Sequence, residues 1–462
     1  GIRDVAPSRG LGMCIRDSYI NLSIIFNICV NIEAREIKKM IKSIILAAGK
    51  GTRMKSDTPK VLHTIFDKTL LGYVIDAVNN TGLADENFVI VGHQADKVEE
   101  FVTSNYNNAR CILQSPQLGT GHAVSMALPY LDDFCGEIII LCGDTPLITA
   151  ETLKEFVQAH KAKKSDITVM SAVFENPANY GRIIRNSNGS LNSIVEEKDA
   201  DDEQKKVKEI NAGVYCLNWE KIKQAFSELK SNNAQGEYYL TDIIKWGNEH
   251  NLTVNAFTLK NNEEIYGINS KANLAEASKL MNQRIINKHL TNGVTIVDPA
   301  TTWISPDTEI EADTIIYPSC YISGKNKIGK HCKIGPFAHL RGDVILEDYV
   351  KIGNFVEVKK TTVKSHTNAC HLTYLGDSEV GSNVNIGAGT ITANYNPLTK
   401  TKSKTIIKDN VKIGSNSVLV APITIEEGAN VGALSCITKC LPPWALALTR
   451  APLRILENWV KK

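Results

Sequence analysis

The spacing of apolar residues divides the chain into two stretches with different periodicities. Between Ser43 and about Trp246, short apolar runs typical of buried strands alternate with segments of helical period. The expected strands are Ser43–Ala47, Phe88–Val91, Ile138–Leu141, Ile167–Val173 and Gly213–Leu217, with helices such as Leu70–Asn79 and Ala150–Ala162 between them. This alternation predicts an α/β domain with a mostly parallel sheet and helices on both faces.

Beyond Pro299, aliphatic residues recur at every sixth position. The first run is Ile304, Ile310, Ile316, Ile322, Ile328, Ile334, Leu340, Leu346, Ile352 and Val358, and the second is Ile407, Ile413, Leu419, Ile425, Val431 and Ile437. Between them the phase slips through Val363, Leu375, Val380 and Ile386. A hexad that persists over this length is typical of a β-helix, in which each hexad supplies one short strand and a turn. A sandwich with coincidental spacing is the alternative.

Two segments flank these domains. A polar stretch from Lys271 to about Leu290 is rich in helix formers and ends at Asn292-Gly293, so it predicts a helix that links them. Near the start, Tyr19–Ile32 is apolar, but asparagines interrupt it and no cleavage site follows. It is also shorter than the ~20 residues of a membrane helix. We interpret residues 1–39 as an extension outside the fold, and a targeting segment as the alternative.

Composition adds few restrictions. Of the 462 residues, 43% are hydrophobic and 22% charged, and the net charge of +2 provides no global attraction to nucleic acid or a membrane. Anionic ligands must therefore be held by local groups. The eleven cysteines form no C-x-x-C pair, and Cys436 and Cys440 lack a second pair that would complete a zinc pattern. We expect buried thiols in a reducing, cytoplasmic compartment.

A loop of small residues follows the first expected strand. Leu46–Met54 reads LAAGKGTRM, and Pro59-Lys60 comes soon after. Small residues let a ligand approach the backbone, whose N–H groups can bind phosphate, and Arg53 and Lys60 could neutralise a triphosphate. The loop is neither a Walker loop nor a dinucleotide fingerprint. Alone, it could be a tight turn.

Further motifs follow in order: Leu113-Gln114, Gln117–His122, Cys142–Leu147, Tyr180–Ile183, Ile194–Asp199, Glu209–Gly213 and Asn233–Asp242. With the loop, this set resembles the nucleoside-triphosphate sugar pyrophosphorylases. With the hexads added, the chain from Met40 to its end is similar to the family of bifunctional N-acetylglucosamine-1-phosphate uridylyltransferases and glucosamine-1-phosphate acetyltransferases. The resemblance implies a Rossmann-like nucleotidyltransferase domain over 40–269, a linking helix over 270–293 and a left-handed parallel β-helix over 294–462.

The resemblance also implies roles in the first domain. Residues expected at the uridine are Leu46, Ala47, Ala48, Gly49, Gln114, Gly119 and Thr120, and those expected at the sugar are Gly181, Glu196 and Asn211. Asp144 and Asn269 are expected to hold Mg²⁺, with Asn269 also near substrate. Asp144 follows a buried strand, at the edge where open α/β sheets bind ligands, and its oxygen suits Mg²⁺. From local sequence alone, Asp144 could instead be a helix cap or turn residue.

The hexads are interrupted around Lys359–Tyr395, where polar residues match the family's acetyl site: Phe337–Arg341, Glu357–Lys360, Cys370–Asp377, Val384–Thr390 and Ala393–Asn396. The resemblance implies that His371 is the general base, a role that suits imidazole at neutral pH. Residues implied at the sugar phosphate are Arg341, Lys359 and Lys402, and those implied to orient the sugar are Tyr374, Asn385 and Asn394. Residues implied at acetyl-CoA are Ala388, Asn394, Tyr395, Ser415, Ala433 and Arg450. The segment Asn396–Lys404 is longer than the family pattern, so Lys400 could replace Lys402.

The implied ligands are UTP, glucosamine 1-phosphate, N-acetylglucosamine 1-phosphate, acetyl-CoA and Mg²⁺, and the implied assembly is a homotrimer without nucleic-acid or membrane partners. Two alternatives stay open. One is a sugar nucleotidyltransferase with a single activity, whose β-helix serves only for assembly. The other is a non-catalytic scaffold, which would leave Arg53, Lys60 and Asp144 unexplained. Acetyl-CoA consumption with glucosamine 1-phosphate would separate these hypotheses.

Overall fold

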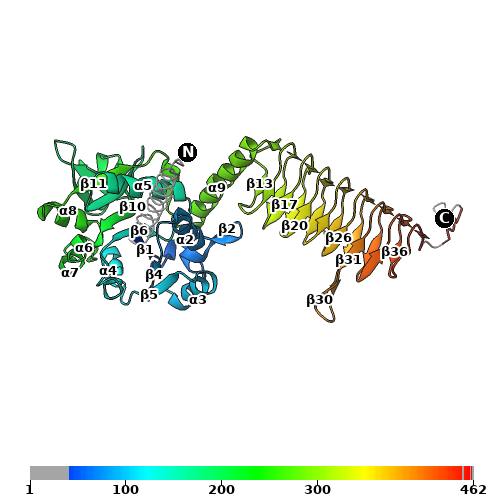
Figure 1. The fold of residues 1–462 in the computed structure, drawn as a ribbon, viewed down its shortest axis with the longest axis horizontal. Coiled ribbons are helices and arrows are strands. Elements are labelled where there is room, and N and C mark those ends of the chain that lie inside the picture. The colour runs from blue at the N-terminus through cyan, green and yellow to red at the C-terminus, as the bar shows by residue number, and fades with distance from the viewer. Residues whose placement is uncertain (1–40, 450–451, 458, 460–462) are drawn as a thin grey trace, which may run out of the picture. The chain divides into compact units, whose positions relative to one another are not determined.

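A computed structural model describes residues 41–449, 452–457 and 459 of the chain, so the prediction for residues 1–39 lies outside the described residues. Contacts divide the chain into two compact units, of which the first ends at Ala277 and the second begins at Ser278. This boundary falls inside helix α9 (Lys271–Thr291), where a linking helix was predicted (Figure 1). Each unit is described separately below.

The first unit is built around one mixed sheet. Its central strands follow the order β11 (Val254–Thr258), β7 (Ile167–Val173), β10 (Glu209–Asn218), β6 (Glu137–Cys142), β1 (Ile41–Leu46), β4 (Asn87–Val91) and β5 (Ala109–Leu113). Neighbours are parallel except that β10 runs antiparallel to β6 and β7. A small ribbon, β8 (Arg182–Arg185) and β9 (Leu191–Val195), joins β10, and β2 (Thr64–Ile65) pairs with β3 (Lys68–Thr69).

Helices cover both faces of this sheet, as the sequence predicts (Figure 1). Residues of α2 (Leu70–Thr81), α3 (Ala95–Asn105) and α5 (Ala150–Ala162) enter one core cluster. Residues of α4 (Thr120–Ser125), α6 (Trp219–Ile222), α7 (Ala225–Glu228) and α8 (Asp242–Glu249) enter the other. Strand β6 alternates between them, because Ile139 belongs to the first cluster and Ile140 to the second. The sheet is therefore buried on both sides, and ligands must bind at its strand ends.

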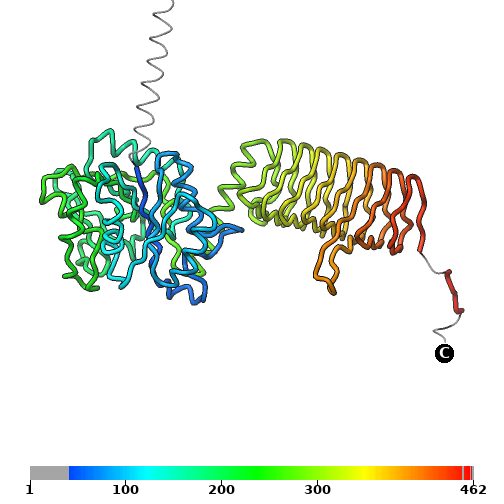
Figure 2. Tube along the Cα trace, turned by 60° about the horizontal axis from the view of Figure 1, so that its bottom comes forward, coloured from blue at the N-terminus to red at the C-terminus, as the bar shows by residue number. Residues whose placement is uncertain are grey.

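The second unit is a solenoid of three parallel sheets, consistent with the predicted left-handed β-helix (Figure 2). The first sheet contains β12 (Thr295–Ile296), β15 (Ile315–Ile316), β18 (Lys333–Ile334), β21 (Lys351–Asn354), β24 (Asn368–His371), β27 (Asn385–Ile386), β32 (Lys412–Ile413), β35 (Asn430–Val431) and β37 (Leu446–Ala447). The second contains β13 (Trp303–Ile304), β16 (Tyr321–Ser323), β19 (His339–Arg341), β22 (Glu357–Lys359), β25 (Tyr374–Gly376), β28 (Ile391–Ala393), β33 (Val418–Val420) and β36 (Cys436–Ile437). The third contains β14 (Glu309–Ile310), β17 (Asn326–Ile328), β20 (Val344–Leu346), β23 (Thr362–Val363), β26 (Ser378–Val380), β31 (Thr405–Ile407) and β34 (Ile423–Ile425).

The predicted aliphatic ladder forms the core of this solenoid. Every residue of the two runs of hexads, and the four residues of the phase slip, is buried. Leu340 pairs with Val358, 18 positions later, whereas Val358 pairs with Leu375 after only 17. The slip consists of two successive shortened coils, because Leu346 pairs with Val363 and Val363 with Val380, each after 17 positions. The stacking continues through both.

A second irregularity is a hairpin that projects from the solenoid (Figure 2). It consists of β29 (Tyr395–Asn396) and β30 (Thr401–Lys402), which pair in antiparallel fashion. Because of this insertion, Val380 pairs with Ile407, the first residue of the second run. The sequence shows only that Asn396–Lys404 is long, and it does not predict a hairpin.

Helix α9 is polar and closes the first end of the solenoid. Asn282 donates its Nδ2 proton to the carbonyl oxygen of Thr302 at 2.8 Å and accepts a hydrogen bond from the backbone N–H of Ile304 at 3.1 Å. The helix is followed by Gly293, whose φ of 87° suits a glycine stop. Among the helices of the described residues, none is both long enough and apolar enough to span a bilayer.

Candidate active sites

The first candidate site lies where parallel strands of the mixed sheet end. The register pairs Leu46 at the end of β1 with Cys142 at the end of β6. The backbone N–H of Gly143 donates to the carbonyl oxygen of Leu46 at 2.9 Å, so the two following loops are held together. The LAAGKG loop and Asp144 therefore lie side by side at the carboxyl edge, as expected for a ligand site in an open α/β sheet.

A cleft of about 450 Å³ opens at this edge. Its lining includes most residues predicted for the nucleotide: Leu46, Ala47, Ala48, Gly49, Lys60, Gln114, Gly119, Thr120 and Asp144. Arg53 is not among the lining residues, and its side chain is exposed on the short 3-10 helix η1 (Thr52–Met54). The structure thus brings together the predicted uridine residues and leaves Arg53 outside this cleft.

Two glycines have backbone geometries that allow the cleft to form. Gly51 has a φ of 58°, and a Cβ there would lie 2.6 Å from Cβ of Lys60. Gly119 has a φ of 111°, and a Cβ there would lie 2.6 Å from the carbonyl oxygen of Tyr238. A larger residue at position 51 would displace Lys60, and one at position 119 would push the backbone away from Tyr238. Both positions are strained and crowded for an L side chain.

The predicted metal ligands converge on a common cation in the structure. The ammonium group of Lys60 donates to Asp144 Oδ2 and, at 3.1 Å, to Asn269 Oδ1. The backbone N–H of Ile268 donates to the carbonyl oxygen of Asp144 at 3.0 Å, which brings Asn269 to this position. A carboxylate and an amide oxygen that already share a positive charge are a donor set suited to Mg²⁺.

The three residues predicted for the sugar also lie together. The backbone N–H of Asn211 donates to the carbonyl oxygen of Gly181 at 2.9 Å, and a Cβ on Gly181 would lie 3.4 Å from Glu196 Oε2. Asn211 Oδ1 accepts a hydrogen bond from the N–H of Gly213 at 2.9 Å, at an irregularity in β10. A Cβ on Gly213 would lie 3.1 Å from Sγ of Cys142, which lines the cleft. The group therefore borders the cleft.

Burial raises the pKa of Glu196 above its ordinary value, because a carboxylate loses hydration there. A hydrogen bond of 3.2 Å from the Thr241 hydroxyl to Glu196 Oε1 acts in the opposite direction. Asp199, Asp242 and Glu237 add negative charge nearby and raise the pKa further. This part of the site suits a ligand that offers hydroxyl groups as donors.

The second candidate site lies on the solenoid around His371. His371 ends β24 and is exposed, and its Nδ1 lies 3.2 Å from Oδ1 of Asn354 on the preceding coil. Since Asn354 Oδ1 can only accept, Nδ1 carries the proton in this contact and Nε2 is left as the basic nitrogen. A base oriented in this way can take a proton from a ligand that faces Nε2.

A column of aligned residues runs from His371 along the solenoid. Backbone hydrogen bonds link successive coils at this position. The N–H of Gly389 donates to the carbonyl oxygen of His371, that of Asn416 to Ala388, and that of Leu434 to Ser415. The coil-equivalent residues are Asn354, His371, Ala388, Ser415 and Ala433, called the His371 column below. Above His371 its side chains are small, so an extended ligand could lie along it.

Three cations predicted for a phosphate form a second group. The side chain of Lys402 lies near Lys359 and is the main cause that lowers the pKa of Lys359, and burial lowers this pKa further. Arg341 also lowers this pKa, whereas Asp377 raises it. Arg341 Nη1 is 2.7 Å from Glu357 Oε1. Between the two lysines that the sequence left open, the structure places Lys402 at this cluster.

The remaining predicted residues lie near these groups. Asn394 is buried and donates its Nδ2 proton to Asp377. Tyr395 is exposed on the hairpin, and Tyr374 influences the pKa of Arg341 through its charge. Asn385 is paired with Asn368 in the first sheet. Arg450 lies outside the described residues.

Several site residues were not predicted individually. Lys50, Gln117, Cys142 and Glu237 line the cleft, and Gln117 Nε2 donates to the carbonyl oxygen of Ala48 at 2.7 Å. Gln117, Cys142 and Glu237 stand inside matched motifs, but their side-chain directions are not visible in the sequence. Asn354 could have been found from coil spacing, since it precedes His371 by 17 positions, the length of a shortened coil.

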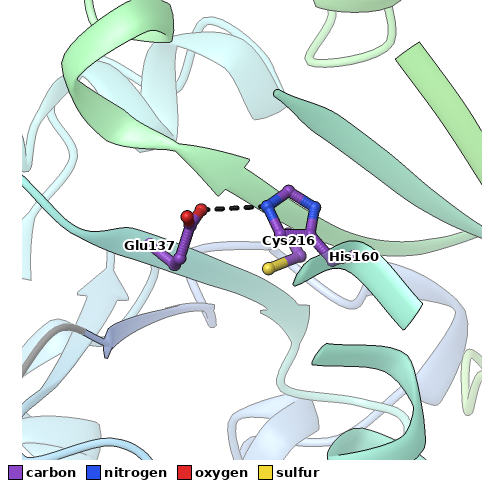
Figure 3. Close-up of side chains that lie close together, drawn as sticks. All are labelled: Glu137, His160 and Cys216. Carbon is purple, nitrogen blue, oxygen red and sulfur yellow. Dashed lines mark hydrogen bonds and ion pairs between the residues drawn. The ribbon is translucent and has the colours of Figure 1, made fainter. Parts of the chain in front are cut away.

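A group of possible metal ligands from β6, α5 and β10 is separate from the residues assigned to either site (Figure 3). Ligand atoms of Glu137, His160 and Cys216 all lie within 4.8 Å of one another. His160 Nε2 is 3.0 Å from Glu137 Oε2, and His160 Nδ1 is 2.8 Å from Thr168 Oγ1, so both ring nitrogens have protein partners. Burial raises the pKa of the Cys216 thiol well above its ordinary value. We interpret the group as a hydrogen-bonded chain that joins α5 to the sheet.

Comparisons with known proteins agree with both parts of this description. Residues 42–267 match the nucleotidyl transferase family, and residues 327–360 match the bacterial transferase hexapeptide family. The bifunctional protein GlmU of Clostridioides difficile is 44% identical over 91% of this chain and 97% of its own length. GlmU of Thermoanaerobacter pseudethanolicus is 44% identical, and that of Geobacillus sp. is 42% identical, with the same coverage of both chains.

Proposed function

Because this chain belongs to the family of the bifunctional protein GlmU, we propose that it is an enzyme with two activities that together make UDP-N-acetylglucosamine. The second unit acetylates glucosamine 1-phosphate with acetyl-CoA. The first unit transfers UMP from UTP to N-acetylglucosamine 1-phosphate and releases pyrophosphate. The observation that carries this proposal is the convergence of Asp144, Asn269 and Lys60 beside a cleft lined by the LAAGKG loop.

Uridylyl transfer brings two polyanions together, so alignment and charge neutralisation dominate its barrier. We propose that Ala47, Gly49 and Gln114 contact the uridine of UTP, and that Lys60 and Arg53 neutralise the triphosphate. The exposure of Arg53, directly after the phosphate loop, leaves its guanidinium free to meet a bound ligand. Asp144 and Asn269 would hold Mg²⁺, which when bound screens phosphate charge. Gly181, Glu196 and Asn211 would orient the sugar hydroxyls.

Acetyl transfer requires a neutral amine, since a protonated amine has no lone pair with which to attack the thioester. We propose that His371 Nε2 removes the amine proton while Asn354 holds the ring through Nδ1. Acetyl-CoA would lie along the His371 column, in contact with Ala388, Ser415 and Ala433, with further contacts from Asn394, Tyr395 and Arg450. Tyr374 and Asn385 would orient the glucosamine.

We propose that Arg341, Lys359 and Lys402 bind the phosphate of glucosamine 1-phosphate. Replacing Lys402 with alanine is expected to raise KM for this substrate about tenfold or more, because a charge-assisted hydrogen bond contributes about 1.5–3 kcal/mol. The turnover number should change less, since the phosphate is remote from the reacting amine. Steady-state acetylation kinetics would measure both values.

Lys400→Ala is the matched control, because it removes the same charge from the same hairpin. It is expected to change KM by less than about twofold, as an exposed charge away from the ligand contributes little. An increase in KM for Lys400→Ala that equals the increase for Lys402→Ala would contradict the assignment.

We further propose a cytoplasmic homotrimer, as the family resemblance implies. One surface supports an assembly. Phe337 and Phe355 stack at 5.1 Å on successive coils and are 51% and 55% exposed, and Leu372 on the next coil is 62% exposed. A row of exposed apolar side chains beside His371 would lose its contact with water against a second copy of the chain.

One experiment separates the proposed function from its alternatives. The full chain is incubated with glucosamine 1-phosphate and acetyl-CoA, and then with UTP and Mg²⁺, while free thiol and pyrophosphate are followed. Both products are expected, the second depending on the first. Pyrophosphate from N-acetylglucosamine 1-phosphate without any thiol release would favour a nucleotidyltransferase with a single activity. Absence of both products would favour a scaffold.

A further inference from the structure

The side chain of Gln114 is nine-tenths buried, yet it lines the cleft. Only 4% of the residue is exposed, and its backbone N–H donates to the carbonyl oxygen of Val91 at 2.8 Å. The backbone of Gln114 is thus held in place, and rotation about the last side-chain torsion exchanges the oxygen and the nitrogen that face the ligand. This inference rests on the proposed function, in which Gln114 meets the base of UTP.

Both hydrogen bonds of this amide use its nitrogen. Gln114 Nε2 donates to the carbonyl oxygen of Gly119 at 2.9 Å and lies 3.1 Å from Nδ1 of His122. An amide nitrogen has two protons, so these partners use both of them. Oε1 has no hydrogen-bond partner among the described residues, and it is the atom left for a ligand in the cleft.

His122 is the partner that can change. It lies on α4, where Gly121 N–H donates to the carbonyl oxygen of Tyr238 at 2.8 Å and so fixes the start of the helix. Its ring lies 6.3 Å from the ring of Tyr238. Burial lowers the pKa of His122, which favours the neutral ring. A neutral imidazole with its proton on Nε2 presents Nδ1 as an acceptor, as Gln114 requires.

We propose that His122 is a positioning residue that sets base selectivity, because it locks the Gln114 amide with Oε1 toward the cleft. Uracil carries a proton on N3 and can donate it to Oε1. Cytosine has an unprotonated N3, which would place two acceptors opposite each other and leave buried polar groups unpaired. Without His122, only the carbonyl oxygen of Gly119 still holds the amide nitrogen. Rotation of the amide, which would offer its nitrogen to N3 of cytosine, then costs less.

The test compares His122→Phe and His122→Leu, which remove the acceptor, with His122→Asn, whose Oδ1 can take the place of Nδ1. The full chain is assayed for kcat/KM with UTP, CTP and dTTP. In the Phe and Leu variants, the ratio of kcat/KM for UTP to kcat/KM for CTP is expected to fall at least about tenfold. This is the effect of one hydrogen bond at a site where a buried polar group would otherwise be unpaired. The Asn variant should retain the ratio.

Two controls separate selectivity from general damage. Thymine keeps the N3 proton, so the ratio of UTP to dTTP should stay constant in all three variants. Ser125→Ala removes a hydroxyl that donates to the backbone oxygen of His122 at 2.8 Å, and it should leave every ratio unchanged.

The outcomes distinguish the inference from the function beneath it. If the wild-type chain uses UTP and the ratio of UTP to CTP is unchanged in the Phe and Leu variants, the role of His122 is overturned and the proposed function is not. Loss of selectivity in the Asn variant as well would assign the effect to packing and also overturn it. A wild-type chain inert toward UTP would overturn the proposed function itself.

Discussion

Replacing Asp144 with alanine is expected to abolish uridylyl transfer, with a loss of at least about 10³-fold in kcat/KM, while acetylation stays near the wild-type rate. The carboxylate lines the cleft and shares the ammonium group of Lys60 with Asn269. Its removal deletes a proposed metal ligand and leaves Lys60 without the carboxylate that it contacts. Electrostatic stabilisation of transferring phosphate is commonly worth several kcal/mol, and each 1.36 kcal/mol is tenfold in rate.

The measurement is pyrophosphate release from UTP and N-acetylglucosamine 1-phosphate at several Mg²⁺ concentrations. Asp144→Asn should lie between wild type and alanine, because it keeps an oxygen but loses the charge. Asp133→Ala is the matched control, since Asp133 is exposed just before β6, at the opposite end of that strand from Asp144. Mg²⁺-dependent activity retained in Asp144→Ala would remove this residue from the metal site.

Replacing His371 with alanine is expected to lower kcat for acetylation by about 10² to 10⁴, the usual contribution of a general base. KM for acetyl-CoA should change little, because proton transfer and not cofactor binding is lost. Uridylyl transfer should be unaffected, since its cleft belongs to the other unit. Release of free thiol from acetyl-CoA, with glucosamine 1-phosphate saturating, measures the effect.

Two further variants test whether the loss is specific. His366→Ala removes a histidine from another corner of the solenoid, where it stacks on Tyr349 at 4.8 Å, and should leave acetylation within about twofold of wild type. Asn354→Ala should give a smaller loss than His371→Ala, because the base remains but its ring is no longer held. If His371→Ala acetylates with a kcat within about threefold of wild type, a loss well below the range of a general base, His371 is excluded as the base.

Features that repeat in the sequence were the most predictable. The hexads identify the core of the solenoid because each inward position must be apolar on every coil, and all of these positions are buried. Helix α5 begins and ends where the periodicity predicts. Its start is fixed locally, since the Thr149 side chain accepts a hydrogen bond from the N–H of Thr152.

Features that depend on non-local contacts were not predictable. The direction of β10 is set by its neighbours β6 and β7, and an apolar run has the same pattern in either direction. Lys60 and Asn269 are far apart in the chain, so their contact requires the folded sheet. Resemblance supplied a metal role for Asn269, whereas local sequence showed only a loop. The orientation of Gln114 likewise depends on His122, which no periodicity distinguishes from a core residue.

The residues of the His371 column are spaced at constant intervals along the axis of the solenoid. Successive coils are spaced by about 4.8 Å, the distance between paired strands, so Ala433, three coils beyond His371, lies roughly 14 Å along the axis. The distance between the proposed base and the far contact proposed for acetyl-CoA is therefore a whole number of coils and does not depend on loop length. Coils gained or lost before β19 leave the distance between His371 and Ala433 unchanged. One coil added between β24 and β35 would lengthen it by the spacing of one coil. A change in solenoid length is thus compatible with this spacing on one side of the histidine and incompatible with it on the other.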